Sequence, residues 1–143
     1  MITIVAVGTV KDSNISSLIQ EYIKRMRRII IKTIKEEKNQ NTDIIKKKEG
    51  ERLLVNAKDS FIIALSEEGK TMNSYAFAEL IKKQQNITFF IGSAFGLDPE
   101  VKKKSNMIVS LSPLTFPHEI AQLLLVEQIY RAHTINEGKN YQK

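Results

Sequence analysis

The sequence predicts an α/β domain with a mostly parallel sheet flanked by helices. Short apolar, β-branched runs alternate with helix-like segments along the whole chain, and this alternation is typical of parallel sheets with helices on both faces. The chain has 143 residues, the length of one domain, and shows neither an internal repeat nor a linker. We therefore expect a single domain over residues 1–143.

The predicted strands are five short apolar runs. They cover residues 2–7, 29–34, 61–65, 87–91 and 107–111. The first run is apolar almost throughout, which is typical of a buried strand, and the run 29–34 is rich in β-branched residues. The first run ends at Gly8, which predicts a turn directly after it.

The first predicted helix follows that turn. Asp12 or Ser13 can cap its first turn, and the residues after them place an apolar stripe at helical spacing. Four of the five residues 24–28 are basic, and positive charge at a helix C-terminus complements the helix dipole.

The remaining helices are predicted over residues 43–58, 75–83 and 98–104, with a last one from Pro117. Proline suits the first helical position, because its missing N–H has no partner there anyway.

The last helix is apolar around most of its circumference, from Ile120 to Tyr130. A helix of this kind has to be covered on nearly all sides. A symmetric homodimer built on this helix provides such cover. Burial of the helix inside its own domain is the alternative.

Composition limits the possible chemistry. The chain has no cysteine and only two histidines, His118 and His133, so we expect no metal site and no Ser-His-Asp triad. His118 lies at a predicted helix start, where it either neighbours a ligand or is structural. His133 is expected at the surface or at an interface.

No apolar run approaches the ~20 residues of a membrane span, so a soluble cytoplasmic protein without membrane contact is expected.

Positive charge is concentrated in the N-terminal part. The first sixty residues carry 13 Lys/Arg and 8 Asp/Glu, out of a net charge of +6 for the chain. Such an excess indicates contact with a polyanion such as RNA. A well-solvated surface is the alternative.

Three strand ends are candidate ligand-binding segments, because ligands of open α/β sheets bind beyond the carboxyl ends of the strands. The first is the segment after Leu65, and the second is a glycine loop over residues 92–96. The third runs from Leu111 to His118 into the last helix. Ordinary turn chemistry is the alternative for each, and neither a dinucleotide fingerprint nor a phosphate loop is present.

The C-terminal tail combines aromatic and basic residues, namely Tyr130, Arg131, Tyr141 and Lys143. Such residues suit stacking and phosphate contacts with RNA. A frayed terminus is the alternative.

An ordered set of motifs resembles one protein family. The N-terminal half contains Val-Ala-Val-Gly, Glu-Tyr and Lys-Glu-Gly-Glu-Arg-Leu-Leu; the C-terminal half contains Phe-Ile-Gly, Leu-Thr-Phe-Pro-His and Glu-Gln-Ile-Tyr-Arg-Ala. In this order and spacing the whole chain resembles RlmH, the ribosomal RNA large subunit methyltransferase H family of the SPOUT class.

The resemblance implies a SPOUT fold with a C-terminal deep trefoil knot, a homodimer and S-adenosyl-L-methionine as methyl donor. It implies transfer of the methyl group to N3 of a pseudouridine in 23S rRNA of the assembled ribosome, by in-line displacement. The cofactor-binding residues that it implies lie at the same three strand ends: Leu65, Gly92, Leu111, Ser112, Pro113, Leu114, Thr115 and Phe116.

On this resemblance, Arg131, Tyr141 and Lys143 are the candidates for holding the target RNA, with Glu127 organising Arg131. The resemblance also implies that the substrate groove uses both subunits.

Three positions depart from the family pattern. Ser93 stands where a second glycine is usual, and Gln122 where an arginine is usual. Gln142 replaces the histidine near the C-terminus, and glutamine cannot act as a general base. The Gln122 and Gln142 replacements favour one alternative function, that of a non-catalytic RNA-binding relative. A flavodoxin-like small-molecule nucleotide enzyme is a second alternative, which is favoured if the basic N-terminal half plays no part in function.

Overall fold

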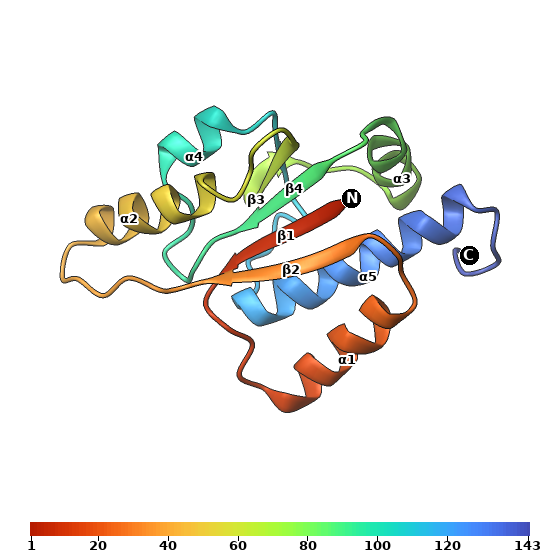
Figure 1. The fold of residues 1–143 in the computed structure, drawn as a ribbon, viewed down its shortest axis with the longest axis horizontal. Helices are drawn as coiled ribbons and strands as arrows, with labels where there is room; N and C mark the ends of the chain where they lie inside the picture. Colours follow the sequence, from red (N-terminus) through yellow and green to blue (C-terminus); the bar gives the residue numbers. More distant parts are fainter.

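Five strands form one parallel sheet in the computed structural model, which describes residues 1–143 (Figure 1). The strands are β1 (Ile2–Val7), β2 (Ile29–Ile34), β3 (Phe61–Lys70), β4 (Ile87–Ile91) and β5 (Met107–Val109). Their order across the sheet is β2-β1-β4-β3-β5, and every neighbouring pair is parallel. The carboxyl ends of β3, β4 and β5 therefore meet at one edge, as the α/β prediction requires.

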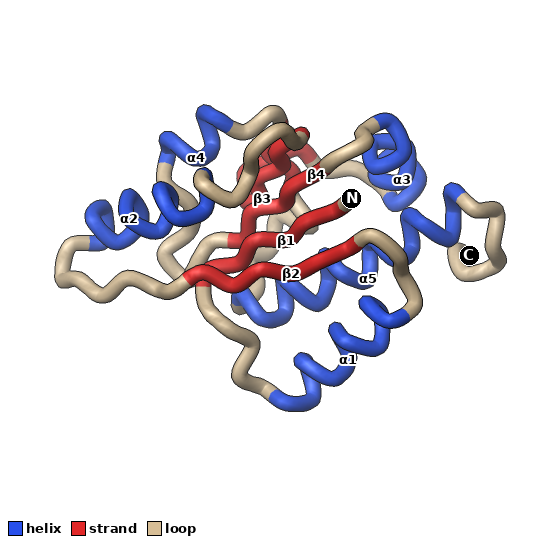
Figure 2. The backbone as a smooth tube through the Cα atoms, in the orientation of Figure 1, coloured by secondary structure: helices blue, strands red, loops and turns tan.

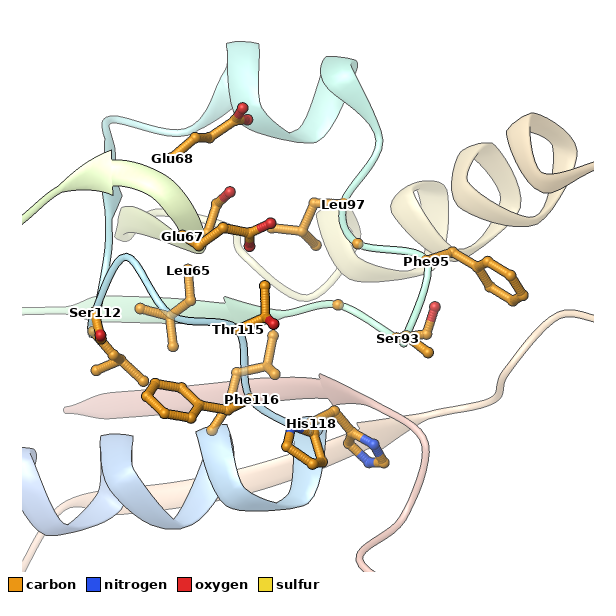
Figure 3. A pocket seen from close by; sticks show the side chains of 18 of the residues that line it. Leu65, Glu67, Glu68, Ser93, Phe95, Leu97, Ser112, Thr115, Phe116 and His118 are labelled. Atoms are coloured by element: carbon orange, nitrogen blue, oxygen red, sulfur yellow. The ribbon is translucent and has the colours of Figure 1, made fainter.

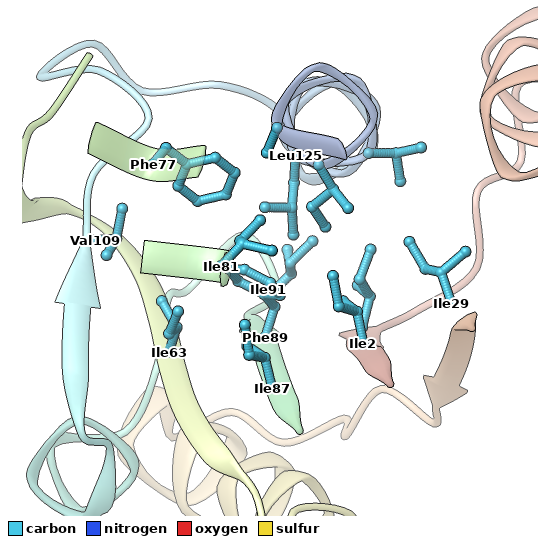
Figure 4. Packing of buried hydrophobic residues seen from close by; sticks show 14 of the residues in the cluster. Ile2, Ile29, Ile63, Phe77, Ile81, Ile87, Phe89, Ile91, Val109 and Leu125 are labelled. Carbon is cyan, nitrogen blue, oxygen red and sulfur yellow. The ribbon is translucent and has the colours of Figure 1, made fainter. Parts of the chain in front are cut away.

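Five helices cover the two faces of the sheet (Figure 2). They are α1 (Ser13–Lys24), α2 (Thr42–Leu54), α3 (Ser74–Lys83), α4 (Pro99–Lys104) and α5 (His118–Asn136). Helices α1, α3 and α5 share a core of 17 buried residues with one face of the sheet (Figure 4). Helices α2 and α4 pack on the other face around a core of eight residues.

Helix α1 begins where the sequence predicts. Asp12 is its N-cap, and the carboxylate accepts hydrogen bonds from the backbone N–H groups of Asn14 and Ile15 at 2.9 and 3.0 Å. The carboxylate of Glu119 in α5 accepts hydrogen bonds from the N–H groups of Lys11 and Asp12. The start of α1 is thus tied to the start of α5.

Several predicted boundaries are wrong. Helix α2 ends at Leu54 rather than at residue 58, because the Asn56 side chain donates to the Arg52 carbonyl at 2.9 Å and Asp59 turns the chain at φ +53°. Strand β3 continues to Lys70 through a bulge opposite Val109.

The C-terminal boundaries also shift. Strand β5 ends at Val109 rather than at residue 111, because the Ser110 hydroxyl turns the chain by donating to the Ser112 carbonyl at 2.8 Å. Pro117 is the N-cap of α5 and not its first helical residue.

Helix α5 lies between α1 and α3 and against the sheet (Figure 1). Leu125, Val126 and Ile129 are fully buried there, and every residue from 118 to 135 is buried or half-buried. Burial within its own domain therefore accounts for much of its apolar circumference, and the homodimer stays a prediction.

Candidate active site

The segments that follow β3, β4 and β5 enclose one cavity of about 590 Å³ (Figure 3). Seven of the eight predicted cofactor residues line it, namely Leu65, Gly92, Leu111, Ser112, Leu114, Thr115 and Phe116. Pro113 does not line the cavity. Sequence reasoning missed Lys46 of α2 and Lys102 of α4, which line the cavity from elements that carry no ligand-binding motif.

The glycine loop is shaped by close packing within itself. A Cβ atom at Gly92 would lie 2.9 Å from the Gly96 carbonyl carbon and 3.1 Å from the Leu97 side chain. The N–H of Gly96 donates to the Ser93 carbonyl at 2.9 Å, and Gly96 has a φ of +83°. Glycine at position 92 is therefore required by the closure of the loop, whether or not a ligand is bound.

The segment after β5 presents unpaired backbone donors. The N–H groups of Leu111, Ser112, Thr115 and Phe116 form no hydrogen bond within the chain. The Ser112 hydroxyl accepts the N–H of Leu114 at 3.1 Å and so fixes the turn. Free N–H groups along a cavity wall can bind a carboxylate or the edge of an adenine.

Charged and aromatic groups complete the cavity wall. The Glu67 carboxylate lines the cavity without a hydrogen bond or ion pair, whereas Glu68 is paired with Lys102. The Lys102 ammonium holds the pKa of Glu68 below its ordinary value. His118 lines the cavity at the start of α5, and its Nε2 is enclosed without a partner.

The C-terminal tail is folded back onto α5 and α1. Arg131 Nε donates to Glu127 Oε1 at 3.0 Å, and the two side chains form an ion pair. Tyr141 donates to the same carboxylate oxygen at 3.2 Å. The contact of Glu127 with Arg131 is the one that the sequence analysis expected, and the tail is packed rather than frayed.

Aromatic rings enclose this ion pair. The Tyr141 ring stacks edge-on against Tyr130, with ring centroids 4.8 Å apart, and lies 4.9 Å from the Arg131 guanidinium carbon. The Tyr141 hydroxyl is 3.4 Å from that of Tyr22 in α1. Burial and this hydrogen bond raise the pKa of Tyr141 above its ordinary value of 10.0. Lys143 is exposed beyond this cluster.

The cavity lies apart from the tail cluster, which consists of Tyr22, Glu127, Tyr130, Arg131, Tyr141 and Gln142. His118 at the cavity and Arg131 in the cluster are separated by 13 helical residues, about 20 Å at 1.5 Å per residue. Neither Arg131 nor Tyr141 lines the cavity. One copy of the chain therefore does not bring the predicted RNA-holding residues to the predicted cofactor residues.

Comparison with known proteins decides the family. A family model described as "Predicted SPOUT methyltransferase" matches residues 1–142. A protein named ribosomal RNA large subunit methyltransferase H from Acholeplasma laidlawii is 40% identical over an alignment of 148 positions, which covers 99% of each chain. This chain belongs to the RlmH family of SPOUT methyltransferases. Its RlmH relative from Prochlorococcus marinus is 41% identical and covers 98% of this chain and 94% of the relative.

A solved structure shows the same fold. A probable methylase family protein from Haemophilus influenzae superposes with a TM-score of 0.58 at 17% identity, over 99% of this chain and 70% of that one. The family assignment from the sequence motifs is thus confirmed, as is the α/β architecture with a parallel sheet.

Two of the residues that depart from the RlmH pattern, Ser93 and Gln142, form hydrogen bonds within the chain. The Ser93 hydroxyl donates to the buried carboxylate of Glu49 at 2.8 Å. Gln142 accepts a hydrogen bond from Arg131 at 2.8 Å, so it holds the tail cluster together.

Gln122 is only 4% exposed and its Oε1 is buried without a partner. In this chain, position 122 faces the interior and not a surface that RNA can reach.

No cluster of three or more His, Asp or Glu side chains suits a metal ion. None of the helices is both long and apolar enough to span a membrane. His133 is half-buried in α5, so its expected place at the surface or at an interface stays a prediction, and burial lowers its pKa below the ordinary value of 6.5.

Proposed function

We propose that this chain transfers the methyl group of S-adenosyl-L-methionine to N3 of a pseudouridine in the 23S rRNA of the assembled ribosome. The observation that carries the proposal is the single cavity formed by the three strand-end segments. Relatives named ribosomal RNA large subunit methyltransferase H, similar over the full chain, supply the reaction and the substrate.

The lining of the cavity fits the cofactor. The unpaired N–H groups of Thr115 and Phe116 suit the adenine edge or the carboxylate of the methionine moiety, and the side chains of Leu65 and Phe116 provide apolar contact. The unpaired carboxylate of Glu67 suits the positive charge of the cofactor. When bound, S-adenosyl-L-methionine supplies an electrophilic methyl group, so the protein contributes mainly binding and orientation.

The tail cluster is suited to orient RNA rather than to remove a proton. Tyr141 is a neutral phenol at neutral pH, and its raised pKa makes it a still weaker acid whose proton is held in the hydrogen bond to Glu127. Arg131 is held by Glu127 and Gln142 in a fixed orientation that suits a phosphate or a base edge.

We further propose that two copies form the substrate groove together. Since Arg131 lies about 20 Å along α5 from the cavity, a substrate held by both requires the tail cluster of a second copy. The half-buried Ile120 and Leu124 of α5 offer apolar surface for such a homodimer. Family membership also supports a C-terminal trefoil knot and a cytoplasmic location, where ribosomes are found.

Calorimetric titration with S-adenosyl-L-methionine, with FMN as the comparison ligand, tests the cavity. Mass spectrometry of the target hairpin, after incubation with ribosomes that lack the modification, tests the transfer, and already methylated ribosomes are the control. We expect the protein to bind S-adenosyl-L-methionine in the titration, and we expect the mass of the target hairpin to increase by one methyl group. Ribosome binding without transfer would instead identify a non-catalytic relative, the function that Gln142 in place of histidine would favour.

Mixing two inactive variants tests the shared groove. A Gly92→Val chain lacks a working cavity, and a chain truncated after Gly138 lacks the tail. In a mixed dimer, the intact cavity of the truncated chain meets the intact tail of the Gly92→Val chain. This dimer therefore contains one complete site and should regain methylation. No regained activity, with mixed dimers present, would mean that each chain works alone.

A further inference from the structure

A turn at the mouth of the cavity exposes an aromatic side chain. Phe95 is 52% exposed in the loop after β4 and lines the rim of the cavity. Figure 3 shows its ring directed away from the cavity, in contrast to Phe116 within it. Phe95 is therefore free to contact a molecule that lies outside the cofactor site.

The turn that carries Phe95 is anchored on both sides. The N–H of Gly96 donates to the Ser93 carbonyl at 2.9 Å and closes the turn. The Ser93 hydroxyl donates to Glu49, which is 3% exposed and also accepts the N–H of Glu37 at 3.1 Å. Because the turn is already ordered, binding through Phe95 loses little conformational entropy.

Two lysines line the same cavity, Lys46 of α2 and Lys102 of α4, and further lysines lie on these two helices. Helices α2 and α4 pack together and carry six lysines and one arginine against four carboxylates, of which Glu49 is buried. Five of these lysines form no ion pair: Lys46, Lys47, Lys48, Lys103 and Lys104. Lys46 and Phe95 both belong to the wall of the cavity, so a cationic and an aromatic side chain border the same cavity.

We propose that the Phe95 turn and the lysines of α2 and α4 form an RNA-binding surface next to the target nucleotide. Phe95 stacks on an unpaired base, and the lysines contact the neighbouring phosphates. This combination favours single-stranded RNA over an acidic peptide, which would use the lysines but not a rigid aromatic face. The proposal rests on the proposed function and extends it to a surface outside the cofactor and tail sites.

Substitution of Phe95 tests the stacking. Phe95→Ala should weaken ribosome binding and raise KM by about 5- to 150-fold, the range for loss of one stacked base. Phe95→Tyr should restore both values, whereas Phe95→Leu, which is apolar without a π-face, should not. Tyr75→Ala is the matched control, because Tyr75 is 59% exposed on α3 away from the cavity.

The lysines are tested through salt dependence. Replacing Lys47 and Lys103 by alanine should reduce the slope of log binding constant against log salt by about 1.4, at about 0.7 per phosphate contact on single strands. An unchanged slope would overturn their role.

Three further results would overturn the proposal. Unchanged ribosome binding by Phe95→Ala would exclude stacking. Weaker S-adenosyl-L-methionine binding by this variant would place Phe95 in the cofactor site, and a change of mass in sedimentation would place it in a dimer interface.

Because ribosome binding is measured directly, the surface is tested even if the wild-type chain transfers no methyl group. A wild-type chain that binds no ribosome would overturn both the surface and the proposed function.

Discussion

The substitution Gly92→Ala separates two reasons why this position is a glycine. The added Cβ would lie 2.9 Å from the Gly96 carbonyl carbon, whereas an ordinary contact begins at 3.4 Å, so the turn has to move by about 0.5 Å. The neighbouring atom is backbone and cannot rotate away. Overpacking of this kind costs about 1–3 kcal/mol. We therefore expect the ligand-free protein itself to lose about that much stability.

The same displacement should weaken cofactor binding. A single misaligned hydrogen bond to the ligand costs about 0.5–1.5 kcal/mol, which corresponds to about 2- to 13-fold in affinity. Urea denaturation without ligand measures the stability, and calorimetric titration with S-adenosyl-L-methionine measures the affinity.

Gly138→Ala is the matched control for Gly92→Ala. Gly138 has a φ of +70° and no neighbour within 4 Å of an added Cβ. Its substitution should cost about 1–2 kcal/mol of stability and leave the affinity unchanged. If Gly92→Ala weakens binding while the stability of the ligand-free protein stays at the wild-type value, the glycine is needed for ligand space and the reasoning from loop closure is wrong.

Three other predictions follow from the tail and from α5. Truncation after Gly138 should abolish methylation and leave calorimetric S-adenosyl-L-methionine binding intact; full activity would remove the role of the tail. Glu127→Gln should lower kcat without changing cofactor affinity, because it weakens the ion pair that orients Arg131, and unaltered kinetics would contradict this. Burial lowers the pKa of His133 in the folded state. As the pH falls, His133 therefore becomes protonated at a higher pH in the unfolded chain than in the folded one. The free energy of unfolding should therefore fall as the pH drops below 6.5, and His133→Gln should reduce that fall in urea denaturation series at pH 7 and pH 5.

Much of the fold could be predicted because local signals are strong. The run 87–91 becomes a strand that is buried at all five positions, and Asp12 caps α1 as its side chain allows. The end of β3 could not be predicted in this way, because it depends on a contact between residues that are distant in sequence. Strand β3 extends to Lys70 because Gly69 lets the backbone of Ile108 and Val109 approach, at 2.8 Å from where a Cβ would lie.

The cavity was predictable to a large extent and its rim was not. Parallel strands place their carboxyl ends at one edge, so Leu65, Gly92 and Leu111 had to lie near one another. Lys46 and Lys102 line the same cavity only because α2 and α4 pack against each other on one face of the sheet. No motif at either lysine predicts this.

The sequence by itself determined the α/β class, the family and the three strand ends that meet. Hydrophobic periodicity and the order of motifs can be read from neighbouring residues without knowledge of the tertiary structure. Only the tertiary structure decided that Ser93 is tied to Glu49, that Gln122 is buried, and that Tyr141 of the tail lies against Tyr22 of α1. Each of these features depends on contacts between residues that are remote in sequence. They depend on how helices pack on a sheet, and local residue patterns do not encode that packing.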